Sequence, residues 1–279
     1  MSSFGTETRI DFGFLVGVVI AAAAIVLGIG ATGIAPSYFL QPTGALIVLG
    51  GTAGVMVVST PRGALVSSLR RTLALFLSAA TRRDALIEEI VHFARITRRD
   101  GLVGLETTVS GVRNNFLKLG LESAVDIGGK EELRNLLETE LRLRERQSEA
   151  DAKTLEVAGG FAPTIGIIGT VVGLIQVMRQ VSDLQSIGAG IGMAFVSTIY
   201  GLALANIVLL PMANRIRARA AEEFEVGEMV LEGVVCIAER LHPTLIRMRL
   251  NAFLRKGKLV PRETVPEPQP ATYKARVGG

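Results

Sequence analysis

Two long apolar stretches in the second half of the chain carry the side chains most suited to chemistry, which are hydroxyls near their middles and prolines toward one end. In chain order these residues, with two polar neighbours, are Pro163, Thr170, Ser197, Thr198, Tyr200, Asn206 and Pro211. A hydroxyl in an apolar helix most often bonds back to a carbonyl of its own helix. On two consecutive helices, such groups could instead form one polar seam that faces an ion path or a partner.

Other motifs lack the context that their chemistry needs. Residues 28–33 fit the G-x-G-x-x-G dinucleotide fingerprint, but an apolar helical stretch precedes them and no acidic residue follows within about 20 positions. His92, His242 and Cys236 form no recognisable metal or catalytic motif. We therefore expect no cofactor, no metal site and no enzymatic activity. A net charge of +4 without a basic stripe interleaved with aromatics does not predict nucleic-acid binding.

The composition is that of an integral membrane protein. Hydrophobic residues make up 49% of the 279 positions and charged residues 20%, and the mean hydropathy is +0.42. A helix needs about 20 apolar residues to cross the hydrocarbon core, so the uncharged run 12–61 holds two spans. We predict an all-α, polytopic membrane protein with a helical cytoplasmic domain and four transmembrane helices, near 11–31, 43–61, 158–178 and 186–213.

Arginines near the span ends predict the orientation, because cytoplasmic flanks are rich in basic residues. They follow the second span from Arg62 and the fourth from Arg215, whereas the turn between the first two spans has none. Both termini should therefore be cytoplasmic. The expected organisation is a short cytoplasmic N-terminus at 1–10, spans one and two at 11–61, a cytoplasmic helical domain at 62–157, spans three and four at 158–214, cytoplasmic C-terminal helices at 215–255 and a disordered Pro-rich tail at 256–279.

The segment 62–156 contains 16 basic and 15 acidic residues, a mixture typical of solvated helices. Within it, leucines at helical spacing predict an amphipathic helix that runs into the third span; they are Leu133, Leu136, Leu137, Leu141 and Leu143. Glycines spaced four apart would let helix backbones approach closely in the membrane. These pairs are Gly13/Gly17, Gly50/Gly54, Gly169/Gly173 and Gly188/Gly192.

Apart from Asp11 at the first position of the first span, the predicted spans contain no Asp, Glu, Lys, Arg or His. A proton path through a membrane needs such a group, and ionisable residues in spans are functional by default. If this chain takes part in ion flow, the ionisable group must come from another protein. The sequence therefore predicts a wall-forming subunit and not a complete transporter.

Residues 162–170, 197–201 and 210–214, with the long charged segment before them, closely resemble the A subunits of flagellar stators in the MotA/TolQ/ExbB proton-channel family. The resemblance extends over about 11–254. It implies a multi-pass protein of the bacterial inner membrane, with five A subunits around two B subunits. The B-type subunit would span the membrane once, carry the ion on an aspartate and bind peptidoglycan.

The resemblance also implies roles for particular residues. Thr170 and Thr198 match hydroxyls that line the ion pathway, to which the polar seam adds Ser197 and Tyr200. Pro163 and Pro211 match the two prolines near that pathway, which we assign to conformational coupling. The stretch 98–106 resembles the family's contact with the rotor protein FliG, with charges at Arg98, Arg99 and Glu106. Without the resemblance, this stretch would be read as an ordinary solvated helix–loop–helix.

Three alternatives stay open from the sequence. A relative of ExbB or TolQ would energise envelope transport, although those proteins typically have three spans, with the cytoplasmic segment after the first. A membrane scaffold would pass no ions. A sodium-driven stator would use the hydroxyls as ligands, but we favour protons as the transported ion, because the family is mostly proton-driven and nothing else in the sequence selects Na⁺.

Overall fold

The computed structural model describes residues 12–31, 33, 36–77, 82–179 and 184–256, and every regular element in these ranges is a helix. This agrees with the all-α prediction. The predicted N-terminal segment and most of the Pro-rich tail lie outside the described residues. The elements that precede the longest helix are α1 (Phe12–Ala31), η1 (Pro36–Phe39), α2 (Pro42–Ser59), α3 (Arg62–Leu77), α4 (Arg83–Asp100), η2 (Leu102–Leu105), η3 (Val109–Gly111) and α5 (Asn115–Asp126).

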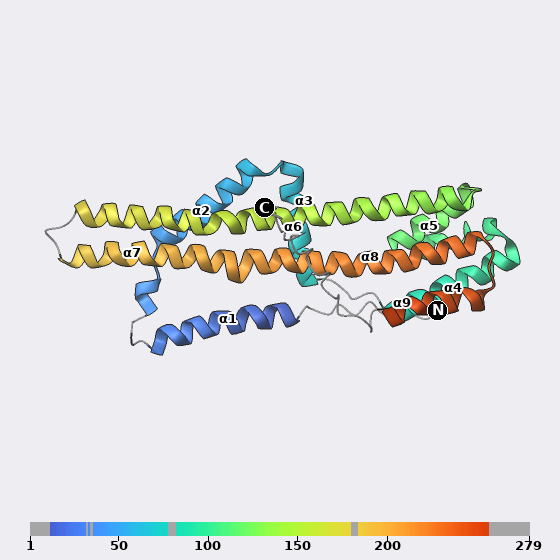
Figure 1. The fold of residues 1–279 in the computed structure, drawn as a ribbon, viewed down its shortest axis with the longest axis horizontal. Coiled ribbons are helices and arrows are strands. Elements are labelled where there is room, and N and C mark those ends of the chain that lie inside the picture. Colours follow the sequence, from blue (N-terminus) through green and yellow to red (C-terminus); the bar gives the residue numbers. More distant parts are fainter. Residues whose placement is uncertain (1–11, 32, 34–35, 78–81, 180–183, 257–279) are drawn as a thin grey trace, which may run out of the picture.

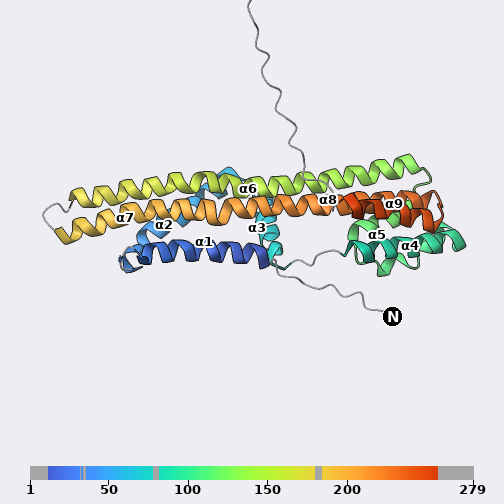
Figure 2. The same ribbon diagram turned by 60° about the horizontal axis from the view of Figure 1, so that its bottom comes forward.

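Two long antiparallel rods form the axis of the molecule (Figure 1). The first is α6 (Lys130–Arg179), a continuous helix of 50 residues. The second consists of α7 (Leu184–Ala203), the π-helical segment η4 (Leu204–Leu209) and α8 (Leu210–Ala238). Each rod has an apolar half and a charged half, and Figure 2 shows that the two rods stay side by side along their length. The amphipathic helix predicted before the third span is thus the first half of α6.

Within the described ranges, three helical segments are long and apolar enough to cross a membrane, namely Ser37–Ser59, Lys130–Arg179 and Ile187–Ala238. The apolar helix Val16–Ala31, within α1, is shorter. The first predicted span, at 11–31, and with it the total of four spans, therefore stays a prediction. Side chains of α1 such as Ile20 and Leu27 are exposed in the isolated chain, as expected of a surface that faces lipid or other subunits.

The charged end of the rods carries a separate hydrophobic core, in which α4, α5 and α9 (Pro243–Lys256) pack against α6 and α8 (Figure 2). Leu133, Leu137 and Leu141 of α6 are buried there, whereas Leu136 and Leu143 are exposed. The buried leucines recur every four residues and so share one helix face. Three of the five predicted leucines thus lie on the buried face of the helix, and the other two do not.

A turn at Gly101 carries the chain from α4 to Glu106. Gly101 has φ +76°, in the left-handed region that glycine adopts without a steric penalty. Its N–H donates to the carbonyl of Thr97, which ends α4. The next long helix, α5, begins at an Asn114 cap whose side-chain oxygen accepts from the N–H groups of Phe116 and Leu117. These two local signals place Glu106 beside α5.

Candidate functional site

The apolar half of α6 and helix α7 approach each other closely because glycines, which have no side chain, lie between them. A Cβ at Gly173 of α6 would lie 2.7 Å from the backbone nitrogen of Ala194. A Cβ at Gly201 of α7 would lie 2.6 Å from the carbonyl oxygen of Ala162. Of the predicted glycine pairs, Gly169/Gly173 makes this contact, whereas Cβ atoms at Gly50 and Gly54 would meet no atom within 4 Å in this chain.

Thr170 and Thr198 meet at this interface. Their hydroxyl oxygens are 2.5 Å apart, and both side chains are half-buried. The Thr170 hydroxyl also lies 3.0 Å from the Ala194 carbonyl oxygen, to which it can only donate. Because Thr170 has a single hydroxyl proton, a bond to Ala194 makes Thr198 the donor to Thr170. The lone pairs of Thr198 then stay available to a cation or to a protonated carboxyl group.

Ser197 and Tyr200, also predicted in the pathway, have different surroundings. Ser197 is fully buried where α2, α6 and α7 meet, and its hydroxyl donates to the Met193 carbonyl at 2.8 Å. Tyr200 donates to the carbonyl of Phe39 and accepts from the N–H of Gln41 at 3.2 Å. It thus fastens α7 to the turn before α2. Their assignment to the pathway stays a prediction. Within this chain, both hydroxyls form hydrogen bonds to the backbone.

The two prolines lie at neighbouring interruptions of the helical hydrogen bonding. Pro163 has no N–H to donate to the carbonyl of Gly159, one turn earlier in α6. Pro211 follows η4, where the Leu210 N–H bonds to the Ala205 carbonyl five residues earlier. A Cβ at Gly159 would lie 2.9 Å from Leu210 Cδ2, so the two interruptions face each other. Proline and π-bulges are common sites of helix bending, and the assignment of the two prolines to conformational coupling stays a prediction.

The predicted rotor residues lie at the far, charged end. Arg98 and Arg99 are exposed at the end of α4, and Glu106 is exposed just after η2. Arg99 and Asp100 form an ion pair at 2.8 Å, and the Arg99 guanidinium holds the pKa of the Asp100 carboxyl below its usual value. Part of the Arg99 charge is therefore engaged locally.

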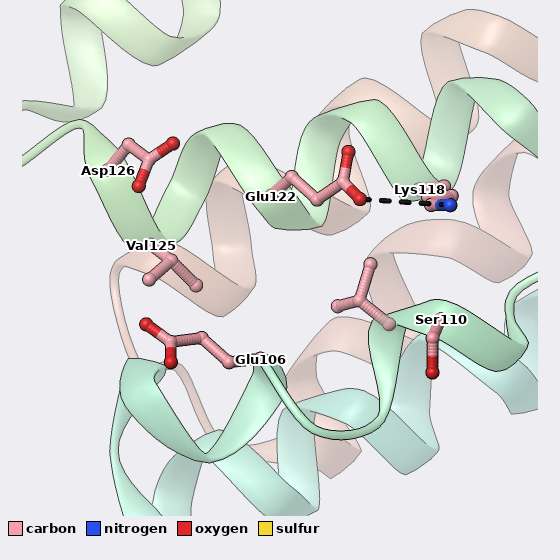
Figure 3. Close-up of a pocket in the computed structure, with 7 residues that line it drawn as sticks. Glu106, Ser110, Lys118, Glu122, Val125 and Asp126 are labelled. Atoms are coloured by element: carbon pink, nitrogen blue, oxygen red, sulfur yellow. Dashed lines mark ion pairs between the residues drawn. The ribbon is translucent and has the colours of Figure 1, made fainter.

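Glu106 borders a shallow hollow of about 260 Å³ between this segment and α5 (Figure 3). Glu122 and Asp126 of α5 line the same hollow, and Lys118 lies 3.9 Å from Glu122 in a weak ion pair. The hollow thus collects three carboxylates and one lysine. These α5 charges were not predicted from the sequence, although their spacing of four residues places Lys118, Glu122 and Asp126 on one face of a helix.

The described residues hold no cluster of three or more His, Cys, Asp or Glu that could bind a metal ion. Gly28 and Gly30 of the fingerprint lie inside α1, and Gly33 lies in a turn with φ +73°. A dinucleotide site needs a strand before these glycines and a helix opening on them. The fingerprint therefore does not have the structure of a nucleotide site.

Residues 70–229 match the MotA/TolQ/ExbB proton channel family, and the chain belongs to that family. Motility protein A of Bacillus subtilis (strain 168) is 29% identical over 86% of this chain and 89% of its own length. Motility protein A of Treponema phagedenis is 30% identical over 84% and 90%, respectively. The structure of C. jejuni MotAB matches with a TM-score of 0.81 and 25% identity, covering 94% of this chain and all of that one.

Proposed function

We propose that this chain is the A subunit of a flagellar stator, which forms an ion channel with a B-type partner and converts ion flow into torque on the rotor. The observation that carries the proposal is the combination of apolar spans without a titratable group and a hydroxyl pair between α6 and α7. Such spans can line an ion path but cannot carry a proton through it. The similarity to motility protein A and to MotAB, over nearly the whole chain, supports the same role.

In the proposed complex, five copies of this chain surround two B-type subunits in the bacterial inner membrane, with four spans each and both termini in the cytoplasm. An aspartate on the single span of the partner carries the ion past Thr170 and Thr198. One elementary charge that crosses the membrane releases about 2.3 kcal/mol per 100 mV. Gain or loss of that charge on the partner shifts the ring, and the level of Pro163 and Pro211 supplies the bend.

The charged end would act on the rotor protein FliG. Arg98, Arg99 and Glu106 are more than 30 residues before the apolar half of α6 in sequence, and Figure 1 places α4 near the N-terminal end of α6, at the opposite end of the rods from α7. Exposed charges suit a contact that must form and break repeatedly, because they affect association rates and register more than affinity. The carboxylates of Glu106, Glu122 and Asp126 would favour a basic rotor surface.

Charge reversal at the proposed rotor surface should impair swimming without preventing membrane insertion. The variant Arg98→Glu with Glu106→Lys should swim at less than about half of the normal speed, since both charges that set the register are inverted. The measurement is swimming speed, with the amount of protein in the membrane quantified in parallel. The matched control is Arg142→Glu, because Arg142 is exposed on α6 in an ion pair with Glu138. Normal swimming of the double variant, or equal loss in the control, would count against this contact.

The transported ion is proposed to be H⁺. Swimming speed at fixed pH should therefore stay unchanged when Na⁺ is replaced by K⁺. Thr170→Ala should reduce speed moderately, through the loss of the bonds to Thr198 and Ala194, and Thr170→Ser should restore it. Speed that collapses without Na⁺ would instead indicate a sodium-driven stator, in which the oxygens of Thr170 and Thr198 act as ligands.

An ExbB- or TolQ-like role in envelope transport is the second candidate. Two apolar helices, α1 and α2, precede the charged segment, whereas those relatives typically have one span there. Deletion of the gene would separate the two functions. Loss of swimming with intact envelope transport supports the stator, and the reverse result supports the alternative.

A further inference from the structure

A buried carboxylate lies just outside the apolar half of α6. The side chain of Asp151 is 1% exposed, and Oδ2 accepts a hydrogen bond from the Ser67 hydroxyl at 3.1 Å. Oδ1 accepts from Nε2 of Gln147 at 3.1 Å, and the guanidinium of Arg71 lies 3.8 Å away. Charged residues in this segment were expected to be solvated, and Asp151 is an exception. Buried charges are costly unless they are paired and hydrogen-bonded, and both conditions are met here.

The network joins three helices. Ser67 and Arg71 belong to α3, Asp151 to α6, and Glu223, which pairs with Arg71 at 3.0 Å, to α8. The Ser68 hydroxyl adds a bond of 3.0 Å to the backbone carbonyl of Asp151. In Figure 1, α3 runs across the two rods, between their apolar and charged halves.

The position of α3 makes this junction mechanically important. Only Thr60 and Pro61 separate α2 from α3, so a displacement of the membrane helix α2 is passed directly to α3. Leu75 of α3 packs with four apolar residues of the rods, which are Ala152, Leu155, Ala213 and Ile216. This small cluster could hold α3 in several registers, because apolar contacts are not directional. The hydrogen bonds to Asp151 are directional and select one of them.

We propose that Asp151 is a positioning residue that fixes α3 across α6 and α8, so that movement of the membrane helices is transmitted to the charged end as torque. The inference rests on the proposed stator function. It assigns Asp151 no contact with the transported ion. Its loss should therefore uncouple torque from ion flow while leaving the channel itself intact.

The pair Asp151 and Arg71 allows a double-mutant cycle. Asp151→Asn replaces one acceptor oxygen by an NH2 donor, so the side chain can no longer accept from both Ser67 and Gln147, and stall torque should fall at least about twofold. Arg71→Gln should lower stall torque further, because it leaves the buried carboxylate of Asp151 without its cation. In the Asp151→Asn variant, by contrast, Arg71 still has an ion-pair partner in Glu223. The double variant should return to the level of Asp151→Asn. The control is Arg142→Gln, which breaks an exposed ion pair on the same helix and should have no effect.

Two measurements are made on each variant, namely stall torque of tethered cells and ion flux of the purified A–B complex in liposomes. The proposal predicts reduced torque with flux within about twofold of wild type. Parallel loss of torque and flux, or additive effects of the two substitutions, would overturn it. If Asp151→Asn does not reach the membrane, Ser67→Ala takes its place, since it removes one bond and leaves the charge paired. Failure of the stator function itself is distinguishable, because the wild-type complex would then give neither torque nor flux.

Discussion

Gly201→Val should abolish swimming. A Cβ at Gly201 would lie 2.6 Å from the Ala162 carbonyl oxygen and 3.2 Å from Pro163 Cα, and both are backbone atoms that cannot rotate away. Overpacking of this kind costs about 1–3 kcal/mol in a well-packed core, and the branched valine adds two methyl groups to the clash. The helices α6 and α7 must separate, which breaks the contact between Thr170 and Thr198. Both the proposed pathway and the level of the prolines would then be disturbed together.

The separation can be measured directly by cross-linking. Thr170→Cys with Thr198→Cys should form a disulfide under oxidation in an otherwise wild-type chain, because the two hydroxyls are 2.5 Å apart. In the Gly201→Val background, the cross-link should be lost. Gly188→Val is the matched control on the same helix, since a Cβ there would meet nothing within 4 Å. Full cross-linking and normal swimming of Gly201→Val would show that the close approach is not required.

Hydrophobic pattern and charge were enough to predict helices from the sequence. The absence of charge over 157–178 and 184–214 located the two apolar halves of the rods, and the leucines from Leu133 to Leu141 located the charged half of α6. These features follow from local composition and helical period, which a single sequence shows directly. The family was also evident from short motifs around Pro163 and Thr198, and the match over residues 70–229 confirms it.

Contacts between distant residues could not be predicted in the same way. Asp151 is 84 residues from Ser67, and nothing local distinguishes it from the solvated acids of its segment. The π-helical segment before Pro211 had a partial signal, since a proline removes one backbone donor, but that loss alone does not specify a π-helix. Glycine spacing likewise marked Gly50/Gly54 and Gly169/Gly173 equally, although only the second pair packs within the chain.

The purified chain without a partner should not conduct ions. The apolar halves of α6 and α7, together with α1 and α2, contain no Asp, Glu, Lys, Arg or His, so no group in them can take up and release a proton. The hydroxyls of Thr170 and Thr198 can accept or donate a hydrogen bond but do not ionise at neutral pH. Conduction should therefore appear only when a B-type subunit supplies a carboxylate within the membrane.

The most direct test is ion flux into liposomes that contain this chain alone, the chain with its B-type partner, or the chain with a partner whose membrane aspartate is replaced by asparagine. We expect flux at the level of empty liposomes for the first and third samples, and clear flux for the second. Equal complex formation by both partners, checked by co-purification, serves as the control. Flux from this chain alone, or undiminished flux with the asparagine partner, would contradict a wall-forming subunit that depends on another protein for its ionisable group.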